Sequence, residues 1–143
     1  MTDAFPIAIY HNPDCGTSRN TLAMIAAAGH VPEVIDYRRV GWTRDLLERL
    51  LAAMEAAPRD LLRAKGTPAA ELGLLEPGTS DDAILAAMVE HPILVNRPIV
   101  VTPLGTRLCR PSEAVFDLLD RVPATFVKED GEVVGPGDPA PSA

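Results

Sequence analysis

The spacing of apolar residues along the chain changes from a strand pattern to a helix pattern and back to a strand pattern. Residues 5–10 form a short apolar run with the β-branched Ile7 and Ile9, which is typical of a buried strand. Residues 17–30 then carry apolar side chains at helical spacing, with Gly29 suited to end the helix. Residues 33–37 again have the pattern of a strand. This order predicts a β-α-β unit with two parallel strands.

A mainly helical segment follows, from about residue 43 to residue 91. Thr43 is suited to begin one helix and Ser80 or Asp81 another, Pro58 interrupts the pattern, and a short helical stretch is predicted around residues 69–72. Residues 97–102 and 106–109 predict two strands of a hairpin, and Pro111 suits the first position of a last helix. Residues 128–143 are rich in Gly, Pro and charge, which predicts a flexible tail.

This order of elements is that of a thioredoxin-like fold with a helical insert before the third strand. We therefore predict an α/β three-layer sandwich with a four-stranded mixed sheet, in which residues 1–127 form one domain that includes the insert of about 43–91. In this fold the third strand usually begins at a cis proline, and Pro98 occupies that place.

Charge and composition exclude several classes of function. The 143 residues carry 20 acidic and 13 basic side chains, a net charge of −7, which disfavours nucleic-acid and membrane-surface binding. No apolar run approaches the about 18 residues of a membrane span, and no signal peptide is recognised, so we expect a cytoplasmic protein. Two cysteines and three scattered histidines predict no metal site.

Cys15 is the clearest candidate for a reactive residue. It lies between the end of the first strand and the start of the first helix, where unpaired N–H groups and the helix dipole favour a thiolate. The following residues, Gly16, Thr17 and Ser18, supply N–H groups and small side chains that suit an oxyanion. His11 could lower the pKa of the thiol as a cation, or could hydrogen-bond within the loop.

The spacing around Cys15 argues against two related chemistries. Ser18 replaces the second cysteine of a C-x-x-C redox pair, and Cys109 is better interpreted as a small apolar residue than as a distant resolving thiol. Arg19 stands at the wrong spacing for the C-x5-R of a cysteine phosphatase and is interpreted as a solvated residue. A thiol that forms a disulfide here must be resolved by an external thiol. Of the arginines, Arg97 is well placed to meet Cys15 in this fold.

Two blocks of sequence resemble one known family. YHNPDCGTSRNTL at residues 10–22 looks like the active-site signature of the glutaredoxin-coupled, glutathione-dependent arsenate reductases. HPILVNRPIVVTPLGTRLCRPSE at residues 91–113 resembles their second block, and LLR at 61–63 and ELGL at 71–74 match between the two. The resemblance extends over about residues 6–133.

The resemblance implies roles for individual residues. Cys15 would be the nucleophile, His11 would help to activate it, and Arg63, Arg97 and Arg110 would bind arsenate. For Arg63 and Arg110, sequence spacing alone does not distinguish a site residue from a surface residue. The family implies no bound cofactor, glutathione as reducing cosubstrate and glutaredoxin as partner. Two alternatives share the fold: a glutathione-dependent thiol reductase, and a transcriptional regulator that binds RNA polymerase.

Overall fold

The computed structural model describes residues 5–135 and divides the chain into two compact units, Met1–Ile35 with Arg97–Ala143, and Asp36–Asn96. We expected one domain with an insert of about 43–91, but the second unit is longer at both ends. The reason is aromatic packing: buried Tyr37 stacks on Trp42 with ring centroids 5.2 Å apart. The indole Nε1 of Trp42 then donates to the carbonyl oxygen of Pro92 at 3.2 Å.

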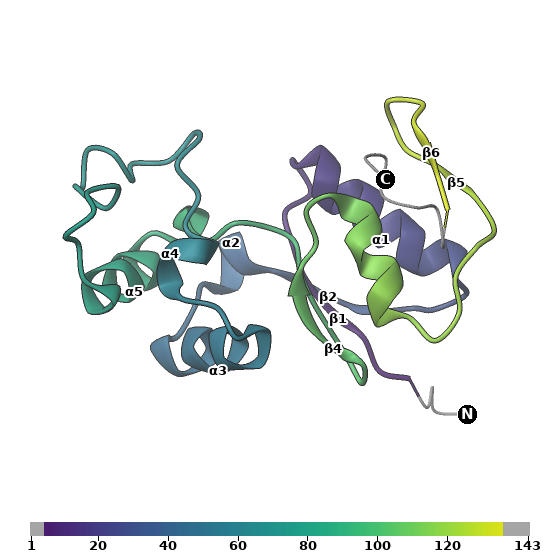
Figure 1. Ribbon diagram of the computed structural model, residues 1–143, viewed down its shortest axis with the longest axis horizontal. Helices are drawn as coiled ribbons and strands as arrows, with labels where there is room; N and C mark the ends of the chain where they lie inside the picture. The colour runs from purple at the N-terminus through teal and green to yellow at the C-terminus, as the bar shows by residue number, and fades with distance from the viewer. Residues whose placement is uncertain (1–4, 136–143) are drawn as a thin grey trace. The chain divides into compact units, whose positions relative to one another are not determined.

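The first unit contains a mixed four-stranded sheet of order β2-β1-β3-β4 (Figure 1). The strands are β1 (Ala8–His11), β2 (Glu33–Asp36), β3 (Ile99–Thr102) and β4 (Gly105–Leu108). β3 pairs antiparallel with both neighbours, Val100 lying opposite Ile9 of β1 and Arg107 of β4. The predicted α/β class, the β-α-β unit and the hairpin are all confirmed.

Two helices accompany this sheet. α1 (Gly16–Ala27) begins after Cys15 and is capped by Ala28, and Gly29 takes the left-handed conformation, φ +92°, that the sequence predicts for a helix end. The last helix, η2 (Ser112–Leu118), is a 3-10 helix and not the α-helix that Pro111 suggested. Its buried Val115 and Leu118 lie three positions apart, a spacing that the three-residue turn of a 3-10 helix places on one face.

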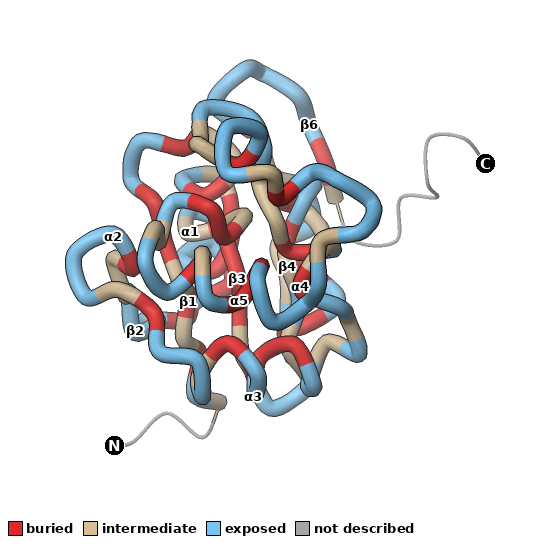
Figure 2. The backbone as a smooth tube through the Cα atoms, turned by 90° about the vertical axis from the view of Figure 1, so that its left-hand side faces the viewer, coloured by how far each residue is buried: buried red, intermediate tan, exposed pale blue. Residues whose placement is uncertain are grey.

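The core of this unit lies between α1, η2 and the sheet. α1 and η2 pack against each other (Figure 1). The central strand β3 is largely buried, whereas intermediate and buried residues alternate along β1 (Figure 2). Most of the core side chains are aliphatic. They are Ile7, Ile9, Met24, Ile25, Ala28, Val100, Cys109, Val115, Phe116, Leu118, Leu119 and Val134.

The last described residues form a second, two-stranded sheet. β5 (Phe126–Val127) pairs antiparallel with β6 (Val133–Val134) (yellow in Figure 1), and Val134 is buried in the core. Gly135 fits closely, because a Cβ there would lie 2.6 Å from the carbonyl oxygen of Ala124. The prediction of a flexible tail is therefore wrong for residues 128–135, where two valines opposite Phe126 and Val127 supply a strand. The rest of that tail, 136–143, lies outside the described residues.

The second unit is helical, as predicted, and its elements are α2 (Tyr37–Val40), α3 (Arg44–Met54), α4 (Pro58–Leu61), α5 (Asp81–Glu90) and the 3-10 helix η1 (Pro92–Leu94). Thr43 and Ser80 begin α3 and α5, their hydroxyls accepting hydrogen bonds from the N–H groups of Leu46 and Ala83 at 3.1 Å each.

The helical stretch predicted around residues 69–72 is absent, and residues 65–78 form turns and bends. Glycines and prolines interrupt the pattern there, and Arg59 holds the segment by donating to the carbonyl oxygens of Leu74, Glu76 and Thr79. Over residues 5–135, no helix combines the length and the apolar character needed to cross a bilayer.

Candidate active site

The loop between β1 and α1 holds Cys15 at the start of the helix. The N–H of Cys15 donates to the carbonyl oxygen of Asn12 at 3.0 Å, and the N–H of Asp14 donates to Asn12 Oδ1 at 2.9 Å. Asn12 is 3% exposed, so this turn has a buried side chain at its centre. Sequence reasoning missed Asn12, although Asn before Pro-Asp is a signal for a side chain that caps its own turn.

Ser18 connects this loop to the first turn of α1. Its Oγ accepts a hydrogen bond from the N–H of Asn12 at 3.0 Å and lies 2.7 Å from His11 Nδ1. The side chains of Ser18 and His11 are both buried. The backbone N–H of Ser18 is a hydrogen-bond donor to the Cys15 sulfur. His11 therefore contacts the residue that binds the sulfur, and its part in activating the thiol stays a prediction.

Arg97 and Arg110 lie at the open end of the β3–β4 hairpin and meet Cys15 there. Arg97 precedes β3 at a cis peptide bond to Pro98, as predicted, and Arg110 follows β4 before a second cis bond, to Pro111, that the sequence did not indicate. Nη1 of Arg110 lies 3.8 Å from Cys15 Sγ and donates to the Arg97 carbonyl oxygen at 2.9 Å. The Arg97 side chain also hydrogen-bonds to Cys15, and its Nε and Nη1 are buried. Two guanidinium groups thus converge on one sulfur.

The surroundings of Cys15 favour its thiolate. Burial raises the pKa of the thiol, but the Ser18 N–H, Arg97 and Arg110 outweigh burial and lower that pKa from 9.0 to about 7. The thiol of Cys109 has the opposite pKa shift. Burial in the core raises the pKa of Cys109 to about 12, and its Sγ donates weakly to the Arg107 carbonyl oxygen at 3.7 Å. Cys109 is a core residue, as the sequence suggested.

Alkylation should show this difference between the two thiols. The rate of Cys15 modification by iodoacetamide is expected to rise through pH 7, with a midpoint at about 7, and to level off above about pH 8 because the thiolate is the nucleophile. Mass spectrometry after each pH step measures it. Cys109 should stay unmodified in the folded protein. A rate that still climbs steeply at pH 9 would contradict the thiolate site.

The remaining predicted site residues are placed as follows. Gly16 and Thr17 form the first turn of α1, and the Thr17 carbonyl oxygen accepts a hydrogen bond from Thr21 Oγ1 at 2.8 Å. Arg63 belongs to the second unit, where its Nη1 donates to Asn96 Oδ1 at 3.2 Å and its Nε to the Lys65 carbonyl oxygen at 3.2 Å. A substrate-binding role for these residues stays a prediction.

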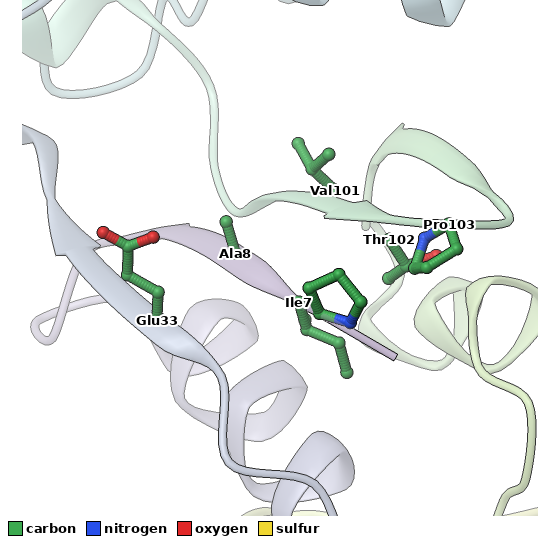
Figure 3. Close-up of a pocket in the computed structure, with 7 residues that line it drawn as sticks. Ile7, Ala8, Glu33, Val101, Thr102 and Pro103 are labelled. Carbon is green, nitrogen blue, oxygen red and sulfur yellow. The ribbon is translucent and has the colours of Figure 1, made fainter. Parts of the chain in front are cut away.

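A pocket beside β1, β2 and β3 offers no competing anion site. Figure 3 shows Glu33 of β2 and Val101 and Thr102 of β3 among its lining residues, and none of the lining residues within 5–135 is an arginine or a lysine. Among these described residues Glu33 alone is charged, and its carboxylate repels anions. No group of three or more His, Cys, Asp or Glu residues that could hold a metal ion is found within residues 5–135.

Comparisons with known proteins identify the family of this chain. Residues 10–118 match the ArsC family. The chain belongs to the ArsC family. An arsenate reductase of Synechocystis is 61% identical over 90% of this chain and 92% of its own length, and one of Escherichia coli K12 is 56% identical over the same shares. The structure of an arsenate reductase from Vibrio cholerae, 41% identical, superposes with a TM-score of 0.77 over 82% of this chain and all of its own.

Membership of the ArsC family confirms the resemblance to arsenate reductases and the thioredoxin-like fold class. The match includes Cys15, Arg97 and Arg110, which the structure brings together from three separate stretches of chain. It also includes Arg63 in the helical unit.

Proposed function

We propose that this protein is an arsenate reductase that uses the Cys15 thiolate as its nucleophile. The observation that carries the proposal is the meeting of Arg97, Arg110 and the Ser18 N–H at the sulfur of Cys15. Such a site offers a nucleophile and a set of anion-binding donors within reach of each other. The arsenate reductases at 56–61% identity support the same activity.

The first step is attack on arsenic. Arsenate docks between the Arg97 and Arg110 guanidinium groups and the N–H groups of Gly16, Thr17 and Ser18 at the start of α1. The Cys15 thiolate attacks arsenic(V), a sulfur–arsenic bond forms, and one oxygen leaves as water after protonation. The arginines offset the charge of the oxyanion both before and during this exchange.

The second step transfers two electrons. A glutathione thiolate attacks the Cys15 sulfur of the adduct, a disulfide forms between Cys15 and glutathione, and the sulfur–arsenic bond breaks with its electron pair on arsenic. Each of the two thiols loses one electron, and arsenic(V) becomes arsenic(III), which leaves as arsenite. Glutaredoxin, with a second glutathione, then reduces the mixed disulfide and restores Cys15.

The need for an external reductant follows from the chain's own thiols. Ser18 stands where a neighbouring resolving cysteine would be, and Cys109 is packed in the core with its pKa raised to about 12. Neither position supplies an accessible second thiol. The chemistry therefore fits the cytoplasm, where glutathione is reduced and abundant.

Arsenate-dependent oxidation of NADPH tests this function. The purified protein is assayed with glutathione, glutathione reductase and glutaredoxin, and turnover is expected to require arsenate, glutathione and glutaredoxin together. Omission of glutaredoxin should leave the mixed disulfide on Cys15, detectable as a glutathione adduct by mass spectrometry. Turnover of a glutathione mixed disulfide without any turnover of arsenate would instead favour a thiol reductase.

A further inference from the structure

The C-terminal hairpin reaches the loop that holds Cys15. Glu129, in the turn between β5 and β6, accepts from Arg19 Nε at 2.8 Å and from Arg19 Nη2 at 3.0 Å. Nη1 of the same guanidinium donates to the Pro13 carbonyl oxygen at 2.9 Å. The N–H of Glu129 also donates to Asn20 Oδ1 at 3.0 Å. Arg19 therefore joins three segments: the loop before Cys15, the first turns of α1 and the hairpin.

We propose that Arg19 and Glu129 form a clamp that fixes the loop from Asn12 to Cys15, so that both act as positioning residues for the nucleophilic sulfur. The hairpin formed by residues 126–134 then helps to position the nucleophile. This proposal rests on the proposed function for its activity readout alone. The state of the thiol is measurable without arsenate.

The contacts of Arg19 favour clamping over substrate binding. All three of its side-chain nitrogens already donate to protein acceptors, and the carboxylate of Glu129 neutralises its charge. The clamp lies over the residue that follows Cys15, because a Cβ on Gly16 would be 3.7 Å from both Arg19 Nη2 and Glu129 Oε1. Solvent screens an exposed ion pair such as this one, but the same guanidinium also carries the carbonyl contact to the loop.

The hairpin is a firm support for Glu129. Val134 is buried in the core, so the end of the hairpin is anchored by apolar packing. Lys128 Nζ lies 2.6 Å from Glu113 Oε1 of η2 and 3.0 Å from Glu132 Oε1. Because Lys128 is held in this way, the backbone next to Glu129 is restrained, and less entropy is lost when the Glu129 carboxylate binds Arg19.

A clamp and a simple charge effect predict opposite results for the thiol. If the pair acted through charge alone, Glu129→Gln would remove an anion, leave the Arg19 cation near the sulfur, and lower the pKa of Cys15. If the pair positions the loop, the same change loosens the contacts of the sulfur with the Ser18 N–H and the arginines. The thiol pKa then rises toward its ordinary value.

The test measures the pH midpoint of Cys15 alkylation by iodoacetamide in the full-length protein, together with arsenate turnover. For Glu129→Gln we expect the midpoint to rise by about 0.5 or more and kcat/KM to fall about tenfold. Arg19→Lys keeps the charge but loses the bidentate fork, so it should show the same two defects. A lowered or unchanged midpoint in both variants overturns the clamp.

A matched control comes from another exposed ion pair of the same unit, Arg107 with Asp117, whose Nη1 and Oδ2 atoms lie 2.8 Å apart. Asp117→Asn removes one carboxylate charge as Glu129→Gln does, and it should leave both the midpoint and turnover unchanged. Circular dichroism checks the fold, and Arg19→Lys carries the test if Glu129→Gln fails to fold. A wild-type protein without arsenate turnover rejects the proposed function, whereas the shift in midpoint still decides the clamp.

Discussion

Replacement of Cys15 by Ser is expected to abolish arsenate reduction, with kcat/KM lower by at least about 10³-fold. A serine hydroxyl is far less acidic than a thiol of pKa about 7, so almost no nucleophile is present at neutral pH. A serine oxygen also cannot form a disulfide with glutathione, so the two electrons that reduce arsenic have no donor pair at this position. NADPH oxidation in the coupled assay measures the loss.

Cys109→Ala is the matched control for this variant. It removes the other cysteine, whose side chain is buried in the core, and alanine keeps the N–H that donates to the Pro98 carbonyl oxygen, so turnover per folded molecule should match that of the wild type. Equal losses in the two variants would indicate that both thiols take part and would contradict the monothiol chemistry. Measurable turnover by Cys15→Ser would overturn the role of Cys15 itself.

Local features of this chain were predictable because their physics is local. The helix starts at Thr43 and Ser80 and the helix end at Gly29 follow from short-range hydrogen bonding and backbone freedom. The structure places Thr43 and Gly29 as predicted, and of the two predicted starts, Ser80 and Asp81, it shows Ser80 capping the helix. The position of Cys15 at the start of α1 belongs to the same class, since a strand end and a helix start fix it within a few residues.

Pairing between strands that are distant in sequence sets the positions that sequence spacing did not predict. Arg110 is 95 residues from Cys15 in sequence, and only the β3–β4 hairpin, with Ile99 opposite Leu108, brings it to the sulfur. The hairpin at the C-terminus was missed for the same reason. Val133 and Val134 stand among glycines, prolines and charges, and their strand is stabilised by pairing with Phe126 and Val127 and by the core. Composition alone predicts flexibility there.

The arrangement also explains how an acidic protein can serve an acidic substrate. The net charge of −7 is a property of the whole chain, whereas anion binding depends on the local electrostatic field around the Cys15 sulfur. Arg107 is paired with Asp117 and Arg19 with Glu129, so carboxylates neutralise the charges of these two cations. Arg97 and Arg110 contact Cys15 itself, and their charge is concentrated where the anion is proposed to bind.

Arg97→Ala and Arg110→Ala are therefore expected to lower kcat/KM for arsenate by about 30-fold or more each, which corresponds to about 2 kcal/mol for a charge-assisted contact. Arg97 should show the larger loss, because its Nε and Nη1 are buried whereas Arg110 is exposed and better screened. Both variants should also raise the pH midpoint of Cys15 alkylation, since each removes a cation that stabilises the thiolate. Steady-state kinetics with varied arsenate measures the first effect.

Two further variants separate anion binding from general charge. Arg107→Ala removes an arginine from the same hairpin that does not contact Cys15, and it should keep wild-type kinetics. Arg63→Ala tests the third arginine that the family resemblance implies, and a higher KM for arsenate is the expected result. Wild-type kinetics in Arg63→Ala would remove that residue from the arsenate-binding set and leave the other two. Unchanged kinetics in both Arg97→Ala and Arg110→Ala would reject the site, because the substrate would then bind equally well without either of the two cations at the Cys15 sulfur.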